Sequence, residues 1–176
     1  MNTRDIYIAL QKNPVTSRSF RGVFAADQLP APDKHFPTSY VANCSNADQV
    51  GSHWIAFFQE EASVIEVFDS YGKPLEYYNS HLVDFTRGLK LIRQVQILQQ
   101  PMSTVCGHYC LYFLFNRYNG ESYDRLIHSF TDNALINDKI VCQYVNRCFE
   151  METKVFDMDM LDQTAKAMVK NLHSTF

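Results

Sequence analysis

The sequence predicts an α+β fold: a central mixed β-sheet surrounded by helices, with a cysteine at the N-terminus of a buried central helix. Three observations support this fold class. Short apolar runs with strand-like composition occupy residues 20–98, whereas helical spacing dominates after residue 105. Two of the runs are separated by only four polar or small residues, which is typical of a hairpin. Residues 106–115 are apolar on almost every side, which indicates a helix enclosed by protein.

Length and composition fit one domain over residues 1–176. The chain has 46% hydrophobic residues, with 13 Phe and 10 Tyr, so a large core can form. A net charge of −3 provides no general attraction to nucleic acid. No apolar run is long enough to span a membrane, and the N-terminus lacks the apolar core of a secretory signal. We therefore expect a soluble, intracellular, monomeric protein.

The first elements are a short helix and two strands. Residues 3–12 predict a helix with Thr3 as its N-cap and Ile6 on its buried face. A strand is expected within residues 20–30, and a second over 39–44, where a polar turn follows.

A hairpin provides the first two candidate catalytic residues. It consists of two apolar runs, residues 50–58 and 63–69. If the turn is centred on residue 61, Phe57 faces Ile65 and His53 faces Asp69, and directly opposite residues have Cβ atoms about 4.5–5.5 Å apart. The contact depends on the register, because a slip of one residue moves the two side chains to opposite faces. Both faces are apolar, which predicts strands that are covered on both sides.

The elements after the hairpin include one further strand. Residues 75–85 are expected to be helical or irregular. Residues 91–98 are expected to form a strand that leads to the helix of Cys106. Helical patterns then cover three segments: residues 123–130, 133–149 and 157–172.

The segment 98–120 predicts a polar loop followed by a buried helix. Ser103 or Thr104 can cap the helix, Cys106 lies in or beside its first turn, and Gly120 provides the left-handed residue that commonly ends a helix. Unpaired N–H groups and the helix dipole lower the pKa of a thiol at this position and favour the nucleophilic thiolate. The alternative is inert packing, because cysteine is among the most buried residue types.

These residues fit covalent catalysis by a nucleophile, a base and an orienting carboxylate. Cys106 would attack a carbonyl, His53 would protonate the leaving amine, and Asp69 would orient the imidazole. Gly107 leaves room for a substrate carbonyl to approach the Cys106 N–H, so it is a candidate substrate-binding residue. The side-chain amide of Gln100 could supply the second hydrogen bond to the oxyanion.

Neither a metal nor a cofactor is required by the sequence. Cys106, His108 and Cys110 lack a fourth ligand with suitable spacing, so a zinc site is not expected. The five cysteines include no Cys-x-x-Cys pair, which indicates reduced thiols rather than a disulfide framework. We expect Cys110 to be a core residue.

Several blocks together resemble the adenovirus maturation protease (adenain) family. They are Gly51–Trp54, Val67–Gly72, Gln99–Pro101 and Cys106–Cys110. The order His, acidic residue, Gln, Cys is similar to that of proteases specific for SUMO and ubiquitin-like proteins. The resemblance covers about residues 1–118. Segment 137–141, which is similar to proteases of virophages and Polinton transposons, extends it to about residue 150.

The resemblance implies a papain-like cysteine endopeptidase that cleaves capsid or other virion precursors, with glycine before the scissile bond. Trp54 would border the narrow substrate cleft. An activating viral peptide or nucleic acid is implied as a partner, and the host cell and the virion as locations. Adenain-type alignment favours Gln99 as the oxyanion donor, whereas the SUMO-protease spacing favours Gln100. We choose Gln100.

Three alternatives share these residues. A deconjugase of a ubiquitin-like modifier would use the same chemistry, but such enzymes typically clamp the modifier tail between two tryptophans, and this chain has only Trp54. A noncatalytic protein-binding module would not need His53, Asp69 and Cys106. An acyltransferase would need a site for an acyl carrier, and no phosphate-binding motif is apparent.

Overall fold

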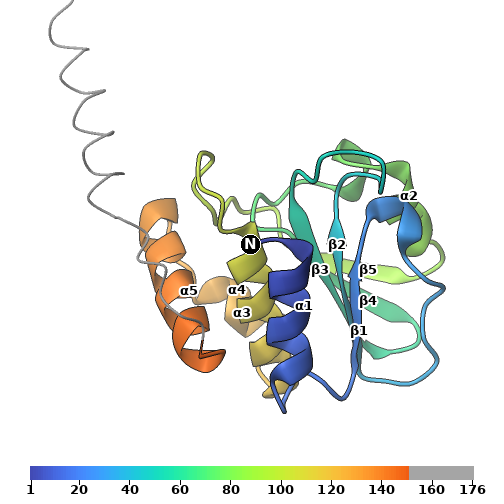
Figure 1. Cartoon of the computed structure of the whole chain (residues 1–176), viewed down its shortest axis with the longest axis horizontal. Helices are drawn as coiled ribbons and strands as arrows, with labels where there is room; N and C mark the ends of the chain where they lie inside the picture. Colours follow the sequence, from blue (N-terminus) through green and yellow to red (C-terminus); the bar gives the residue numbers. More distant parts are fainter. Residues whose placement is uncertain (151–176) are drawn as a thin grey trace, which may run out of the picture.

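A five-stranded mixed β-sheet is the centre of the computed structural model, which describes residues 1–150 (Figure 1). Its strands are β1 (Phe20–Phe24), β2 (Thr38–Asn43), β3 (Trp54–Glu61), β4 (Val64–Phe68) and β5 (Lys90–Arg93). The strands lie in sequence order. The β1/β2 and β4/β5 pairs are parallel, and β2/β3 and β3/β4 are antiparallel. The predicted α+β fold is therefore confirmed.

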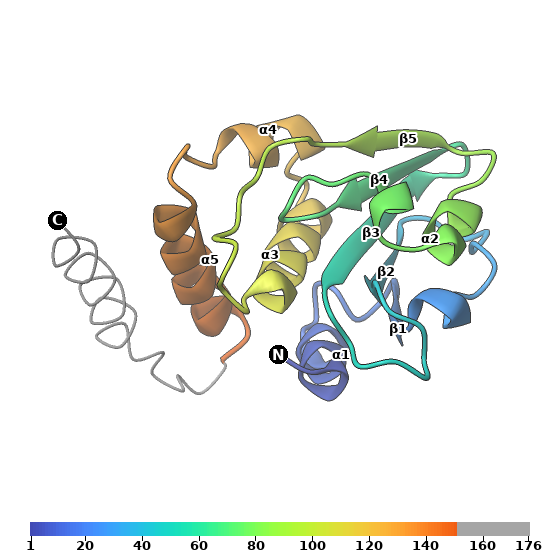
Figure 2. The same ribbon diagram turned by 90° about the horizontal axis from the view of Figure 1, so that it is seen from above.

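Helices cover both faces of this sheet (Figure 2). They are α1 (Thr3–Lys12), α2 (Ser80–Phe85), α3 (Cys106–Tyr118), α4 (Tyr123–His128) and α5 (Ala134–Cys148), with 3₁₀ turns η1 (Ala26–Gln28) and η2 (Leu75–Tyr77). Within residues 1–150, no helix has the length and apolar character needed to cross a membrane. The helix predicted over 157–172 lies outside the described residues, so the single domain over 1–176 stays a prediction.

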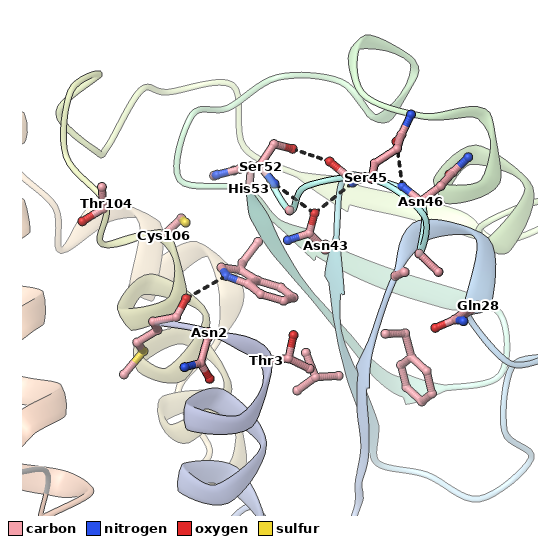
Figure 3. Close-up of a pocket in the computed structure, with 18 of the residues that line it drawn as sticks. Asn2, Thr3, Gln28, Asn43, Ser45, Asn46, Ser52, His53, Thr104 and Cys106 are labelled. Atoms are coloured by element: carbon pink, nitrogen blue, oxygen red, sulfur yellow. Dashed lines mark hydrogen bonds between the residues drawn. The ribbon is translucent and has the colours of Figure 1, made fainter.

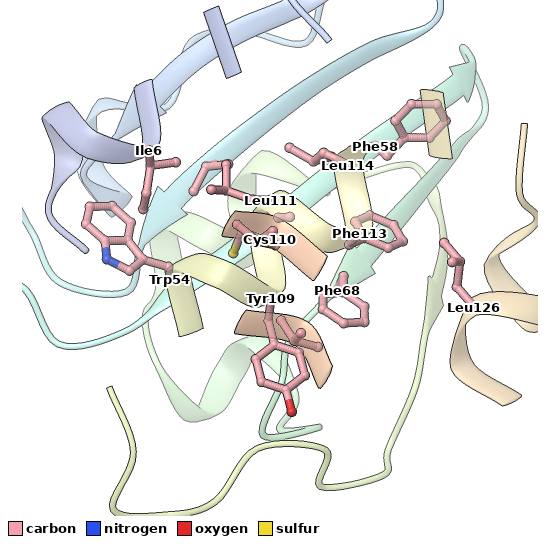
Figure 4. Packing of buried hydrophobic residues seen from close by; sticks show 14 of the residues in the cluster. Ile6, Trp54, Phe58, Phe68, Tyr109, Cys110, Leu111, Phe113, Leu114 and Leu126 are labelled. Carbon is pink, nitrogen blue, oxygen red and sulfur yellow. The ribbon is translucent and has the colours of Figure 1, made fainter. Parts of the chain in front are cut away.

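Side-chain alternation along β3 divides the interior into two cores, as predicted for strands covered on both sides. Trp54, Ala56 and Phe58 belong to the larger core, which also contains the buried faces of α1 and α3 (Figure 4). Ile55 and Phe57 belong to the smaller core beneath α2. Because successive strand residues point to opposite faces, these apolar runs contribute to both cores.

Helix α3 is enclosed by protein, as its composition predicts. Tyr109, Leu111, Phe113 and Leu114 are fully buried, and the Phe113 ring stacks on Phe68 of β4 with centroids 4.7 Å apart. The end of the helix is also as expected, since Gly120 adopts a left-handed φ of 87°.

The caps of the helices differ from the sequence-based expectations. Val105, rather than Ser103 or Thr104, is the N-cap of α3 and provides no side-chain hydrogen bond. Ser103 is instead engaged within the loop, where its carbonyl and hydroxyl oxygens accept from the Gln99 amide. In α1, Asn2 replaces Thr3 as the cap.

The register of the β3–β4 hairpin differs from the prediction by two residues. Phe57 pairs with Val67 rather than with Ile65. The strands turn tightly between Glu61 and Val64, and an irregularity between Phe58 and Glu61 shifts the pairing. A shift of two residues leaves every side chain on its predicted face.

The strand predicted over residues 91–98 is shorter in the structure, where β5 ends at Arg93 and residues 94–98 leave the sheet. Val95 and Ile97, the apolar residues of this stretch, are 70% and 58% exposed. The buried Gln94 explains the departure, because its amide donates to the Asp69 carbonyl and its oxygen accepts from Tyr123 at 2.6 Å. Side-chain bonds therefore replace the sheet ladder at this point.

A buried ion pair joins α3 to the sheet. Arg117 donates through Nε and Nη2 to the two carboxylate oxygens of Glu66 on β4, at 2.6 and 2.9 Å. Both residues are less than 10% exposed, and burial raises the pKa of Glu66, opposed by Arg117. Loss of Arg117 would leave the Glu66 carboxylate buried without a cationic partner, whereas after loss of Glu66 the guanidinium would still reach Glu60 at 3.0 Å.

We expect Arg117→Ala to lower the free energy of unfolding by about 3–5 kcal/mol, because it removes one member of a buried pair. Urea unfolding measures this change. Arg125→Ala is the matched control, since Arg125 pairs with Glu121 at the surface, and we expect it to cost less than about 1 kcal/mol. Equal losses in the two variants would contradict the role given to Arg117.

Candidate active site

Three separate elements bring the predicted catalytic residues to one end of the sheet. Cys106 is the first residue of α3, His53 directly precedes β3, and Asp69 directly follows β4. A groove of about 730 Å³ opens at this end, and both His53 and Cys106 line it (Figure 3). The strand ends and the helix N-terminus therefore fix the positions of these side chains.

The predicted contact between His53 and Asp69 is present. His53 Nε2 lies 2.6 Å from Asp69 Oδ1, and the two residues are 5% and 3% exposed. The carboxylate also accepts from the backbone N–H groups of Tyr71 and Lys73, at 3.0 and 2.8 Å, and from the Tyr78 hydroxyl at 2.9 Å. These bonds hold Asp69 in one orientation and compensate for its burial.

Two tyrosines of the site were not identified from the sequence. The Tyr71 ring stacks on the His53 imidazole with centroids 4.6 Å apart, and the Tyr78 ring lies 5.5 Å from it. The position of Tyr71 two residues beyond Asp69 could have indicated it, because the turn keeps Tyr71 close to this carboxylate, which accepts from its backbone N–H at 3.0 Å. Tyr78 lies outside any strand pattern and had no such signal.

The pKa values of His53 and Cys106 move in opposite directions. Burial alone would lower the pKa of His53, but hydrogen bonds and charge interactions with Asp69 and Cys106 raise it to about 9. Burial alone would raise the pKa of Cys106. Contacts with His53, together with the backbone N–H groups of Trp54 and Gly107, lower it overall. The site thus favours a thiolate–imidazolium pair.

The neighbouring thiols differ from Cys106. Burial raises the pKa of Cys44, Cys110 and Cys142, in the last case to about 11. Cys110 is 1% exposed and lies in the larger core, so its prediction as a core residue is confirmed.

The two glutamines before Cys106 have different environments. The Gln99 side chain is fully buried, and its Nε2 donates to the Ser103 carbonyl at 2.9 Å and lies 3.2 Å from the Tyr71 hydroxyl. Gln100 is half-buried, and two hydrogen bonds hold its backbone: its N–H donates to Asp138 Oδ1 on α5 at 3.4 Å, and its carbonyl accepts from the Ser103 N–H at 3.0 Å. Gln99 is not itself among the described residues that line the groove, but it contacts two that are, Tyr71 and Ser103. The role predicted for Gln100 stays a prediction.

Trp54 and Gly107 border the site in different ways. Trp54 lines the groove, and its indole N–H donates to the Met1 carbonyl at 3.3 Å. A side chain at Gly107 would lie 2.9 Å from Met1 Cβ and 3.2 Å from Ile6 Cδ1. Gly107 therefore permits the close approach of α1 to α3, and its predicted contact with substrate stays a prediction.

The environment of His108 is that of a buried residue rather than of a catalytic one. It is 8% exposed, its Nδ1 has no hydrogen-bond partner within residues 1–150, and burial lowers its pKa to about 4. Across residues 1–150, no three His, Cys, Asp or Glu side chains gather in an arrangement that could hold a metal ion.

The chain matches a known protein family. The family model described as "Adenovirus endoprotease" matches residues 20–152. That range contains β1–β5, α2–α5 and the site formed by His53, Asp69 and Cys106.

Individual relatives agree with the family match. A protein named "Protease" from Frog adenovirus 1 is 28% identical over 109 residues, and one from Avian adenovirus 8 is 30% identical over 121 residues. The alignments cover 49% and 60% of this chain, and they span 53% and 59% of the lengths of those relatives. Among solved structures, an ASFV protease is similar, with a TM-score of 0.49 and 17% identity, over 85% of this chain and 66% of that one.

The Asp69 carboxylate sets the protonation of His53, so we expect Asp69→Asn to lower the pKa of His53 from about 9. The hydrogen bond and charge that raise this pKa are lost, while the burial that lowers it remains. The His53 imidazolium should then lose its proton at a lower pH. The Cys106 thiolate should lose its cationic partner over the same pH range. NMR titration of the His53 ring measures the change.

Asp33→Asn is the matched control, because Asp33 forms a carboxylate–imidazole contact with His35 at 3.0 Å on the surface. It should leave the His53 titration unchanged. An unchanged His53 pKa in Asp69→Asn would contradict the role of Asp69.

Proposed function

Because this chain belongs to the adenovirus endoprotease family, we propose that it is a cysteine endopeptidase with Cys106 as its nucleophile. The observation that carries this proposal is the contact of His53 with Asp69 beside Cys106, at one end of a groove. A lowered thiol pKa next to a raised imidazole pKa is the electrostatic condition that covalent catalysis by cysteine requires.

In the proposed reaction, the Cys106 thiolate attacks the carbonyl carbon of the scissile bond and forms a tetrahedral oxyanion. The His53 imidazolium then gives its proton to the leaving amine, so the C–N bond breaks and a thioester remains. Neutral His53 next removes a proton from water, and the resulting hydroxide displaces the sulfur and releases the acid. Asp69 keeps the imidazole oriented throughout, because three other hydrogen bonds fix its own carboxylate.

Two donors would stabilise the oxyanion: the Cys106 backbone N–H and the amide of Gln99. We place Gln99 in this role because its Nε2 lies between Ser103 and Tyr71, both of which line the groove. The 3.2 Å contact with Tyr71 is the longest of its hydrogen bonds. It is therefore the one that a developing oxyanion would most readily replace.

The substrates we propose are virion precursor proteins of the genetic element that encodes this chain, because the chain belongs to the adenovirus endoprotease family. Cleavage after glycine-containing sites suits a groove bordered by Trp54, because glycine lets an extended backbone pass between close walls. Among the described residues that line the groove, none is Asp, Glu, Lys or Arg. Recognition by backbone hydrogen bonds and neutral side chains fits a peptide better than it fits a phosphate backbone.

Cleavage of a proteome-derived peptide library, with the candidate precursor proteins added, tests the function. We expect the wild type to cut and Cys106→Ala to lose all cleavage, because the nucleophile is gone. Iodoacetamide should label Cys106 below the pH at which an ordinary thiol reacts. Cys142→Ala is the matched control and should keep full activity, since the Cys142 pKa is raised to about 11. The proposal would be refuted by cleavage with Cys106→Ala. It would also be refuted if the wild type hydrolyses conjugates of a ubiquitin-like modifier but cleaves no peptide.

The choice between the two glutamines has its own test. We expect Gln99→Ala to lower kcat by about 10²–10³, the usual cost of losing one oxyanion donor. Gln100→Ala, the matched neighbour, should keep kcat within a few-fold of wild type. Peptide-cleavage kinetics measure both variants. A large loss in Gln100→Ala alone would return the role to Gln100.

A further inference from the structure

Helix α5 presents apolar side chains to solvent. It is the outermost described helix on the α3 side of the sheet, as Figures 1 and 2 show, and its inner face packs in the larger core. On its other side, Leu135, Ile136 and Ile140 are between 47% and 50% exposed. We call these three residues, together with the exposed Gln143 and Arg147, the outer face of α5.

The inner side of α5 holds the loop that precedes Cys106. Asn137 Nδ2 donates to the Leu98 carbonyl at 3.2 Å. Asp138 Oδ1 accepts from the Gln100 backbone N–H at 3.4 Å. A segment that covers the outer face would therefore stabilise the helix to which this loop is bound.

The chain beyond residue 150 starts at one end of the outer face. Helix α5 ends at Cys148, and Glu150 has a φ of 47°, a left-handed conformation that commonly ends a helix and turns the chain away from its axis. Residues 151–176 follow directly, and almost all of them lie beyond the family match, which ends at residue 152.

The sequence of this segment has the spacing of a helix with one apolar face. Over residues 157–172, apolar residues recur at alternating intervals of three and four: Met158, Leu161, Ala165, Met168 and Leu172. In a helix, Asp159, Gln163 and Lys166 would lie on the opposite side. A helix of this length is only marginally stable by itself in water, so its apolar face needs a surface to cover.

We propose that residues 157–172 form a helix that docks antiparallel on the outer face of α5 of the same chain. The exposed leucine and isoleucines of α5 would then contact the apolar face of the segment. The inference does not depend on the proposed function, because it concerns the packing of the domain and not the reaction.

The lengths of the two segments and of their connection fit the antiparallel direction. At 1.5 Å per residue, the 15 residues of α5 span about 22 Å and residues 157–172 would span about 24 Å. An antiparallel turn leaves the connection over residues 150–156 ample slack. A parallel arrangement would require it to run back along the whole of α5, which takes nearly its full reach of about 23–25 Å.

Charge selects the same direction. Asp157 and Asp162 would flank the first half of the apolar face of the segment. In the antiparallel arrangement they lie beside the exposed Arg147 in the last turn of α5, and opposite charges attract. In a parallel arrangement they would instead approach the exposed Asp132, which precedes α5.

Amide hydrogen exchange of the full chain tests the docking. We expect residues 157–172 of the wild type to exchange at least about tenfold more slowly than an unstructured chain, at every protein concentration. Ile140→Gln and Leu161→Gln, one on each side of the contact, should each bring the exchange of this segment to within about twofold of the unstructured rate. Leu91→Gln is the matched control and should keep the protection, because Leu91 is 40% exposed but lies on β5.

Charge reversal tests the direction. We expect Arg147→Glu to speed the exchange of residues 157–172 by about two- to fivefold, as for a surface ion pair. Asp162→Arg in the same chain should restore slow exchange, because the two charges are then interchanged. A loss of protection in Arg147→Glu that Asp162→Arg does not restore would overturn the antiparallel direction.

Three other results would overturn the docking itself. The first is fast exchange of residues 157–172 in the wild type, including protection that appears only after another protein is added. The second is protection that Ile140→Gln leaves intact. The third is protection that rises with protein concentration, because it would assign the outer face to a second copy of the chain. Failure of the peptide-cleavage assay would change none of these readings.

Discussion

The 2.6 Å contact between His53 and Asp69 joins the ends of two central strands, and the other parts of the site are arranged around it. The strands are buried on both faces, so the contact is carried by the most enclosed part of the sheet. Backbone N–H groups and a tyrosine hydroxyl occupy the remaining lone pairs of the carboxylate. The imidazole is thereby held in place before any substrate arrives, which is the preorganisation that catalysis requires.

Burial disfavours the charged forms of Cys106 and His53, but interactions with neighbouring groups outweigh this effect. Desolvation would make Cys106 a neutral thiol and His53 a neutral imidazole, yet each stabilises the charged form of the other. The N-terminus of α3 contributes through the backbone N–H of Gly107. The buried Arg117–Glu66 pair ties the far end of this helix to β4, so helix and hairpin hold a fixed relative position. The thiolate–imidazolium pair of Cys106 and His53 depends on this fixed position.

The sequence predicted the elements well and their exact pairing less well. The contact of His53 with Asp69 survives a register error of two residues because side chains in a strand alternate with a period of two. The choice between Gln99 and Gln100 could not be made in the same way, since an irregular loop has no period. The contact of Asp138 with the Gln100 N–H was equally hidden, because it depends on how α5 packs against a loop residue 38 positions earlier in the chain.

A crystal structure of the protein with a peptide aldehyde that ends in glycinal tests the central claim most directly. The account predicts a bond from Cys106 Sγ to the aldehyde carbon, with the resulting oxygen bound by the Cys106 N–H and Gln99 Nε2. The peptide should lie in the groove beside Trp54. Attachment at another cysteine, or an adduct oxygen that faces away from both donors, would contradict the account.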